Sequence, residues 1–513
     1  MSKNIDIVFI NPNNSGQVYQ KLSSKYSAIE PPTWSLLLAE SCRSKGFNVG
    51  IIDANAENLE DQEIYNRLKK KNPKFVCFVV YGQNVNSGTT NMSGATRTSK
   101  YLKSQNLDKK IIFIGSHVQA LPVETIQKEK TIDIICTNEG VYTLHNLLKL
   151  KDVSEETLKK IKGIIFLDKN DNVVFNDSEK IVPQEKMDID LPGYAWDLLP
   201  YKERPFDLYR SPMWHAGYVD ENRSPYAAIQ TSLGCQFKCE FCMINIINRQ
   251  DNDEVGVASN YSKMRFWSTE FIIKEFDKLI SYGVKTIKIT DEMFLLNPKY
   301  YLPLCKLLKN RNKNNDLRIW AYSRIDTVKR REVLQTIKEA GIKWLCLGIE
   351  SADKKVRLEI SKGKFEDVDV KKVVQQIHDS GIEVMANYIY GLPGDNAESM
   401  KKTLDLSIEL CTSGWNSYAA MALPGSLLYK QAKEKGLNLP KTYSEYSFHS
   451  YESLPLSNEF LSAKEILMFR DSAFIKYHRN KSFLSRIENK FGKIAVENIN
   501  EMLKVKLERK IFN

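Results

Sequence analysis

The sequence predicts an α/β protein built from two successive units, a Rossmann-like domain and a partial (βα)6 barrel, followed by a mostly helical C-terminal region. Three observations predict this order. From residue 5 to about 150, short β-branched apolar runs alternate with amphipathic helical stretches. A stretch marked by prolines follows, and the same alternation resumes at Ala227. Beyond Lys430 the apolar residues recur mostly at helical spacing.

The first unit contains five candidate strands, each followed by a candidate helix. The strands are expected at 5–10, 48–53, 75–81, 110–115 and 133–137, and the helices at 34–45, 60–70, 92–104, 123–129 and 141–150. Strands that alternate with helices of this length favour a parallel sheet that is covered on both faces. The pattern is typical of a flavodoxin-like or Rossmann-like domain.

A short hairpin and a linker are expected between the two units. Residues 161–175 have the pattern of a β-hairpin with a polar turn at 168–172. The prolines that follow disfavour helix at the residue before each of them; they are Pro183, Pro192, Pro200, Pro205 and Pro212. The predicted division of the chain is therefore 1–150, 151–222, 223–430 and 431–513.

The second unit contains about six strand–helix repeats. Its strands are expected at 227–232, 286–290, 317–323, 344–349, 383–389 and 416–421. Six repeats are fewer than the eight of a closed barrel, so we expect an open, partial barrel. In barrels of this kind the functional groups lie at the carboxyl ends of the strands.

Composition indicates a soluble, cytoplasmic globular protein. Hydrophobic residues make up 42% of the chain, no leader pattern is visible, and no apolar run is long enough to span a membrane. Nine scattered cysteines do not form a disulfide framework. The net charge is +11, and residues 464–513 carry 12 Lys or Arg against 6 acidic residues. This excess is typical of a solvated helical face, while a lipid surface, nucleic acid or an acidic substrate are the alternatives.

Three cysteines are clustered directly after the first barrel strand. Cys235, Cys239 and Cys242 have the spacing C-x3-C-x2-C. Three thiolates can hold three irons of a 4Fe–4S cluster and leave the fourth iron open to a small molecule. A zinc site would need a nearby histidine, but the nearest histidines before and after the cysteines are His215 and His378. An accidental grouping of three buried cysteines is the remaining alternative.

With these cysteines the chain resembles the radical S-adenosylmethionine (SAM) superfamily, whose cysteine loop has an aromatic residue before the last cysteine, here Phe241. Further matches lie at the strand ends, in barrel order: 290–294, the GIES segment 348–351, the GLPG segment 391–394 and the PGSLLY segment 424–429. The GLPG segment is followed by Asp395, where the family usually has Glu.

The resemblance implies that SAM contacts Phe241, Asp291, Glu292, Arg324, Glu350, Gly391 and Pro393. Ordinary structural roles are open for several of these residues. Asp291 and Glu292 could form a polar strand end, and Glu350 could be a buried carboxylate with a paired cation. Arg324 could pair with a carboxylate of SAM or form an ordinary salt bridge.

The first unit resembles the cobalamin-binding domain that precedes the barrel in many members of the superfamily. The resemblance implies that cobalamin contacts Asn11, Tyr81, Gln83, Asn84, Gly115, Ser116, Glu139 and Gly140. The chain departs from relatives that supply a cobalt-ligating histidine, because it lacks the D-x-H-x-x-G segment and His117 has a different context. The lower face of cobalt would then face Tyr81, Gln83 or Asn84, and no histidine imidazole would ligate it. A domain that has lost the cofactor is the alternative.

The resemblance implies an enzyme that uses a 4Fe–4S cluster, SAM and cobalamin. Its expected function is to generate a 5'-deoxyadenosyl radical and to methylate an unactivated carbon of a small-molecule or lipid-like substrate. Expected partners include an electron donor such as flavodoxin or ferredoxin, and nucleic acid is not expected. A radical cyclase, a ring-contracting enzyme or an oxidising enzyme, with or without cobalamin, is the alternative. A non-catalytic metal-binding scaffold protein is the third possible function.

Overall fold

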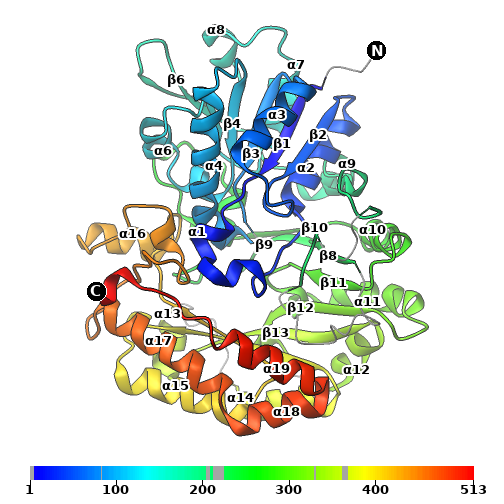
Figure 1. Cartoon of the computed structure of the whole chain (residues 1–513). Helices are drawn as coiled ribbons and strands as arrows, with labels where there is room; N and C mark the ends of the chain where they lie inside the picture. Colours follow the sequence, from blue (N-terminus) through cyan, green and yellow to red (C-terminus); the bar gives the residue numbers. More distant parts are fainter. Residues whose placement is uncertain (1–4, 83, 204–207, 212–224, 329–330, 361–367) are drawn as a thin grey trace.

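Two α/β units are stacked on one another in the computed structural model, which describes residues 5–82, 84–203, 208–211, 225–328, 331–360 and 368–513. Figure 1 shows the N-terminal sheet and its helices at the top and the second sheet below them. The helices α17 to α19, in orange and red, lie at the far side of the second sheet. Within the described residues, no helix has both the length and the apolar character needed to cross a membrane.

The first unit is a seven-stranded sheet in the order β2-β1-β3-β4-β5-β6-β7. Its strands are β1 (Ile7–Asn11), β2 (Val49–Asp53), β3 (Phe75–Val79), β4 (Lys110–Ile114), β5 (Ile134–Cys136), β6 (Ile164–Leu167) and β7 (Val173–Phe175). The five predicted strands form and run parallel. The predicted hairpin forms as β6 and β7, but it extends this sheet as an antiparallel edge instead of standing apart in the linker.

Apolar side chains on both faces of the first sheet explain its two helical layers. Ile7 and Phe9 pack in one core with helices α2 and α7, while Val8 and Ile10 pack in another with α3, α4 and α6. Successive strand residues point to opposite faces, so a continuous apolar strand needs cover on both sides. The helical elements are α1 (Ser15–Tyr19), η1 (Gln20–Ser24), α2 (Thr33–Ser44), α3 (Asp61–Lys71), η2 (Val85–Ser87), α4 (Gly88–Ser104), α5 (Ser116–Ala120), α6 (Pro122–Lys128), α7 (Val141–Lys149) and α8 (Glu155–Leu158), followed by η3 (Gln184–Lys186), α9 (Met187–Asp190) and η4 (Trp196–Leu198).

The second unit is a curved sheet of six parallel strands in the order β15-β14-β13-β12-β11-β8, which confirms the partial barrel. Its strands are β8 (Tyr226–Ile229), β11 (Thr286–Ile289), β12 (Arg318–Arg324), β13 (Ile342–Glu350), β14 (Glu383–Tyr390) and β15 (Gly414–Ala419). The single strand expected at 227–232 is divided. Ser232 instead begins β9 (Ser232–Cys235), which pairs with β10 (Lys263–Phe266) in a separate two-stranded sheet.

Helices follow the barrel strands and begin at side chains that cap their first turns. Ser268 accepts a hydrogen bond from the Phe271 amide at the start of α10, and Asn297 caps α11. The elements are η6 (Ile244–Asn248), η7 (Ala258–Tyr261), α10 (Thr269–Ser281), η8 (Phe294–Leu296), α11 (Pro298–Arg311), η9 (Ile325–Thr327), α12 (Arg331–Glu339), α13 (Lys354–Ile360), α14 (Val370–Asp379) and α15 (Ala397–Leu410). The carboxyl ends of β8 and β11 to β15 form the barrel mouth, which faces the first unit (Figure 1).

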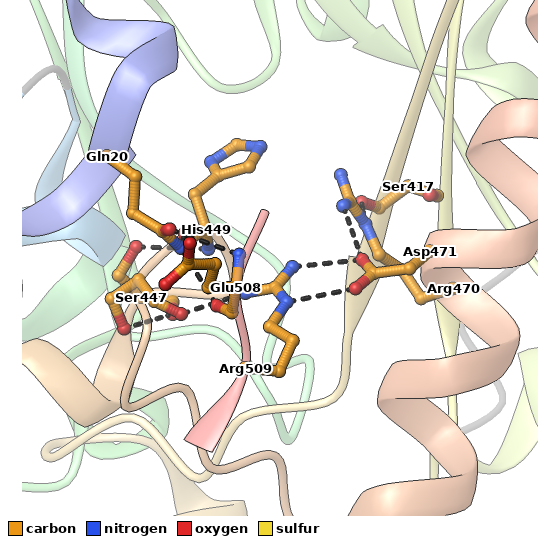
Figure 2. Close-up of polar contacts among 9 residues, drawn as sticks. Gln20, Ser417, Ser447, His449, Arg470, Asp471, Glu508 and Arg509 are labelled. Atoms are coloured by element: carbon orange, nitrogen blue, oxygen red, sulfur yellow. Dashed lines mark hydrogen bonds and ion pairs between the residues drawn. The ribbon is translucent and has the colours of Figure 1, made fainter. Parts of the chain in front are cut away.

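The C-terminal region is helical, as predicted, and it contacts both units. Its elements are α16 (Leu427–Glu434), η10 (Ser444–Tyr446), α17 (Ala463–His478), α18 (Lys481–Phe491), α19 (Lys493–Met502) and η11 (Lys510–Phe512). The polar contacts that we call the C-terminal clamp are formed by Gln20, residues 447–451, Arg470, Asp471 and residues 508–510. Figure 2 shows those of Gln20, Ser447, His449, Arg470, Asp471, Glu508 and Arg509.

The clamp joins the end of the chain to its beginning. The Gln20 amide nitrogen donates to the backbone oxygens of His449 (2.7 Å) and Glu508 (3.1 Å). Arg509 donates two hydrogen bonds of 2.9 Å to the carboxylate of Asp471 on α17. The last residues therefore fix the α1–η1 segment of the first unit to α17 of the C-terminal region.

Candidate functional site

The cysteine loop leaves the barrel at β9 in a tightly determined conformation. Gly234 has φ +81°, and a Cβ atom there would lie 2.1 Å from the backbone oxygen of Lys263. The Cys235 amide donates to Asn245 Oδ1 (2.8 Å), and the Phe237 amide donates to Cys235 Sγ (3.4 Å). Only glycine tolerates this approach, so the backbone places the first sulfur independently of any bound group.

Burial strongly affects all three cysteine thiols. Burial raises the pKa of Cys235 and of Cys239 to about 12, and it raises that of Cys242 further. Each of the three also feels the field of another cysteine of the set. Without a metal the thiols are therefore neutral, whereas bound iron would supply the positive charge that stabilises thiolates. This donor set fits a 4Fe–4S cluster.

Two adjacent carboxylates at the end of β11 have different surroundings. Asp291 accepts three hydrogen bonds of 2.6 Å, from the amide and hydroxyl of Thr231 and from the Ser232 hydroxyl. It therefore ties the first and second strand ends together. Glu292 accepts none from the described residues and is partly exposed. Burial raises the pKa of Glu292 to about 7, although the charge of Lys288 partly offsets the effect.

Glu350 lies at the end of β13 in a strained backbone conformation. Its φ is +63°, and the pairing between β13 and β14 shifts register between Gly348 and Glu350. A Cβ atom at Gly348 would lie 2.5 Å from Glu350 Oε1, so glycine makes room for the carboxylate. Burial raises the pKa of Glu350 to about 7, and none of the described residues donates to it. A strained, unpaired carboxylate at a strand end is typical of a ligand-binding group.

Arg324, at the end of β12, stacks on the cysteine loop. Its guanidinium carbon lies 3.7 Å from the centre of the Phe237 ring, and its Nε donates to Asp326 Oδ1 (2.7 Å). The side chain is 6% exposed. Asp326 already neutralises the arginine, so the ordinary salt bridge considered above is present, and a SAM carboxylate would have to share the guanidinium. The SAM role of Arg324 stays a prediction.

The turn after β14 is shaped by its own hydrogen bonds. Gly391 has φ +82°, and its amide donates to Asp395 Oδ2 (3.0 Å). The Asp395 carboxylate also accepts from the Ser399 hydroxyl, so the residue that replaces the usual Glu supports the turn. Phe241 packs beside this turn in an apolar cluster that includes Leu392 and Ile360. The cysteine loop and the ends of β13 and β14 therefore meet at one place.

The predicted cobalamin residues lie at the carboxyl ends of the strands in the first sheet. A Cβ atom at Gly115 would lie 2.4 Å from the backbone oxygen of Val80, so glycine permits a close approach of β3 and β4. Ser116 Oγ is buried without a hydrogen-bond partner among the described residues. An orphaned hydroxyl at a strand end fits a site that a polar ligand completes. The Tyr81 hydroxyl accepts from Gln119 (2.5 Å).

The other predicted cobalamin residues are differently engaged. Asn84 caps η2 by accepting from the Ser87 amide (3.2 Å). Asn11 donates to Asp53 (2.7 Å), and the buried Glu139 carboxylate pairs with Arg265 (2.7 Å). Gly140 has φ +85° at the start of α7, and Gln83 lies outside the described residues. Glu139 therefore bridges the two units. The cobalamin roles of these residues stay predictions.

Two polar contacts near the mouth were absent from the sequence predictions. Lys288 of β11 pairs with Glu30 of the first unit (2.7 Å), and both side chains are 4% exposed. Asn86 of η2 contacts the cysteine loop at Cys242 and Met243. A lysine among the apolar residues of β11 could have indicated an inward-facing charge from the sequence alone. No sequence pattern indicated a role for Asn86. His117 is buried against Thr89 (3.2 Å) in the first unit.

Comparisons with known proteins agree with this geometry. Residues 229–407 match the family model of the Radical SAM superfamily, and residues 20–148 match that of the B12 binding domain. An uncharacterized methyltransferase of Pyrococcus horikoshii is 26% identical over 93% of this chain and 94% of its own length. An anaerobic magnesium-protoporphyrin IX monomethyl ester cyclase of Rubrivivax gelatinosus is 21% identical over 99% of this chain and 84% of its own length.

Two solved structures have the same arrangement of domains. The radical SAM methyltransferase TsrM from Kitasatospora setae, with cobalamin and a [4Fe-4S] cluster bound, aligns with a TM-score of 0.63 and 14% identity over 98% of this chain and all of that one. The cobalamin-dependent SAM radical enzyme OxsB, with aqua-cobalamin bound, aligns with a TM-score of 0.65 and 15% identity over 98% and 72% of the two chains. At these identities the likeness is one of fold.

Proposed function

Because this chain belongs to the radical SAM enzymes and carries a B12-binding domain, we propose that it is a cobalamin-dependent methyltransferase that acts on an unactivated carbon. The radical SAM domain implies a 4Fe–4S cluster and SAM, and the B12-binding domain implies cobalamin. When bound, the cluster supplies the electron that cleaves SAM, and cobalamin supplies a methyl carrier.

The proposed roles of the chain's own residues follow from their positions. Cys235, Cys239 and Cys242 would hold three irons, and a set of three cysteine ligands leaves the fourth iron to SAM. Glu292 and Glu350 lie beside the cysteine loop and receive no hydrogen bond from the described residues, so their carboxylates are available to the SAM ammonium group. Asp291 would hold the loop's strand end in place through Thr231 and Ser232.

One observation carries the proposal that cobalamin and SAM chemistry occur in one site. The Met243 amide, next to the last cysteine, donates to Asn86 Oδ1 of the first unit (2.9 Å). Asn86 follows Tyr81 and Asn84, which lie at the end of β3 where the lower face of cobalamin is expected. The cobalamin-type domain and the cysteine loop are therefore in direct contact, as a methyl transfer between two cofactors requires.

The barrel interior favours a substrate whose inserted part is uncharged. Lys288 is neutralised by Glu30, and Arg324 is neutralised by Asp326. The same region carries aromatic and amide side chains: Tyr322, Asn387, Asn416 and Tyr418, and the Asn416 amide donates to the Tyr418 hydroxyl (2.7 Å). Aromatic faces and amides bind neutral groups by contact and hydrogen bonding. A small or lipid-like molecule with such a group is the proposed substrate class.

A radical cyclase is the second candidate. The observation in its favour is the match to the Rubrivivax gelatinosus cyclase, which spans 99% of this chain. The two candidates differ in the fate of the SAM methyl group. A methyltransferase moves it to the product, whereas a cyclase forms a bond within the substrate and leaves that methyl group out of the product.

Isotope transfer tests the proposal. The anaerobically reconstituted protein, supplied with cobalamin and a reductant, would be incubated with methyl-deuterated SAM and cell extract, and products would be read by mass spectrometry. We expect a bound corrinoid, 5'-deoxyadenosine and a product that carries the deuterated methyl group. A product without label, accompanied by deoxyadenosine, supports the cyclase. Absence of bound corrinoid under saturating supply contradicts both cobalamin-dependent candidates.

A further inference from the structure

The short helix η2 of the first unit touches the cysteine loop through Asn86. Asn86 Oδ1 accepts from the Met243 amide (2.9 Å), and Asn86 Nδ2 lies 3.7 Å from Cys242 Sγ. These two contacts join residues that are 157 and 156 positions apart in the chain. The first unit therefore reaches one of the three cysteine sulfurs directly.

The orientation of the Asn86 amide is fixed by the first of these contacts. A backbone amide can only donate, so the Asn86 atom that faces Met243 must be the oxygen. The nitrogen then faces Cys242. A thiol at Cys242 can donate to the Asn86 oxygen (3.8 Å), but a sulfur bound to iron has lost its proton. With a cluster present, the remaining interaction is an N–H donated by Asn86 to the sulfur.

The loop that carries Asn86 is held rigidly. The Ser87 amide donates to Asn84 Oδ1 (3.2 Å), and the Asn84 amide is bonded in turn to the Ser87 hydroxyl (3.3 Å). Gly82 has φ +69°, and a Cβ atom there would lie 2.4 Å from Ser87 Oγ. The position of Asn86 is therefore set by the first unit and does not depend on the cysteine loop.

The three sulfurs receive different contacts. Cys235 Sγ accepts from the Phe237 amide of its own loop (3.4 Å), and Cys239 feels the positive charge of Arg324 within the barrel. Cys242 is the sulfur whose side-chain hydrogen bond comes from the first unit. Hydrogen bonds to cluster sulfurs stabilise the more electron-rich, reduced state and so raise the reduction potential.

We propose that Asn86 is a positioning residue that donates to the iron-bound sulfur of Cys242, raises the reduction potential of the cluster and couples that potential to the first unit. This inference rests on the proposed function, because it requires a bound cluster. The same η2 loop follows Tyr81 and Asn84, so a change in this loop on cobalamin binding would reach the cluster through one amide.

Two substitutions separate the donor from the loop contact. Asn86→Asp keeps an oxygen acceptor for Met243 and removes the N–H donor, whereas Asn86→Ala removes both. Asn66→Ala is the matched control, because Asn66 lies on α3 and, among the described residues, its side chain accepts a hydrogen bond only from exposed Gln62. Each reconstituted full-length protein would be titrated with dithionite, and the reduced cluster would be followed by electron paramagnetic resonance.

We expect the equilibrium constant for one-electron reduction to fall about tenfold in Asn86→Ala, since the lost N–H stabilises the reduced cluster more than the oxidised one. Tenfold corresponds to a midpoint about 59 mV more negative for a one-electron couple. Asn86→Asp should fall at least as far, because it also adds negative charge. The iron–sulfur stretching frequencies in resonance Raman spectra should shift in both variants and not in Asn66→Ala.

The outcomes are separable from those of the proposed function. If the wild-type protein assembles no cluster, the proposed function fails. If it assembles a cluster and Asn86→Asp has the wild-type midpoint or a higher one, the role of Asn86 is overturned whatever Asn86→Ala does. Repeating the titration with and without cobalamin tests the coupling, because cobalamin should shift the wild-type midpoint more than that of Asn86→Asp.

Discussion

The barrel mouth and the C-terminal clamp both bury charged side chains, but they supply those charges with different partners. In the clamp, Asp471 binds Arg470 and Arg509, as Figure 2 illustrates. Arg509 also donates to the Ser450 carbonyl (2.9 Å). At the mouth, Glu292 and Glu350 receive no hydrogen bond from the described residues. Paired charges stabilise the fold, whereas unpaired ones at a strand end are available to a ligand.

Charged side chains in this protein differ in whether another residue of the chain pairs with them. Burial alone does not leave a charge available to a ligand, because Glu139 and Arg265 are also fully buried and pair with each other across the two units. A partly exposed carboxylate that receives no hydrogen bond from the described residues is the informative case. The largest effect of a substitution is therefore expected at the three cysteines, whose proposed partner is the iron–sulfur cluster.

Replacing Cys239 should remove the mouth's function and leave the clamp intact. Cys239→Ala deletes one of three iron ligands, so we expect loss of the iron-sulfur absorption and of 5'-deoxyadenosine production. Cys305→Ala is the control, since this thiol is buried in α11 with apolar neighbours. Iron content and deoxyadenosine yield are the measurements. A Cys239→Ala protein that retains its cluster and cleaves SAM would contradict the assignment.

Breaking the clamp should have the opposite effect. Asp471→Asn leaves Arg470 and Arg509 buried without their carboxylate, which costs about 3–5 kcal/mol of unfolding free energy. Iron content per folded protein should not change. Asp405→Asn, which breaks an exposed pair with Lys401, should cost less than about 1 kcal/mol. Urea unfolding midpoints compare the two, and equal midpoints would show that the clamp is not a stabilising contact.

A paired carboxylate far from the mouth should control stability at low pH. Burial raises the pKa of Glu383, but hydrogen bonds from Ser413, Lys490 and Arg486 outweigh it and lower the pKa to about 2. Because the folded pKa lies below the usual 4.5, this stabilisation is complete above about pH 5 and is lost as pH falls toward 2. The loss is up to about 3 kcal/mol at about 1.4 kcal/mol per pKa unit.

Glu383→Gln is the matched variant for this pH dependence. It should be less stable than wild type at pH 7 and should lose less stability between pH 5 and pH 3. Unfolding midpoints measured over that range check the prediction. Parallel pH curves for the two proteins would assign the acid sensitivity to other carboxylates.

The elements that sequence predicted well are those specified by neighbouring residues. The strands of both sheets followed from local alternation, and the cysteine loop followed from spacing within eight residues. The α1–η1 segment was missed because it is short and buries only Val18. The division of the strand predicted at 227–232 was also missed. Ser232 pairs with β10 in a separate sheet, and the local sequence pattern does not indicate which sheet a residue joins.

Contacts between the units could not be predicted for a different reason. Glu30 and Lys288 are 258 positions apart, and Asn86 and Cys242 are 156 apart. Each pair forms only because two separately predictable units stack in one orientation, and nothing in either segment specifies that orientation. The positive φ of Glu350 was equally hidden, because it arises from a register shift between β13 and β14.

The last test compares two carboxylates at the mouth itself. Glu350→Gln keeps the size of the side chain and removes its charge, so a SAM ammonium group would lose a charged hydrogen bond of about 1.5–3 kcal/mol. We expect the KM for SAM to rise about tenfold to hundredfold, with unchanged unfolding free energy because no described residue depends on Glu350. Asp291→Asn should instead lower the unfolding free energy, since Thr231 and Ser232 lose their acceptor. If Glu350→Gln destabilises the fold and leaves KM unchanged, Glu350 stabilises the fold as the charges of the clamp do. The proposed difference between mouth and clamp would then not hold for Glu350, the residue with the strained backbone.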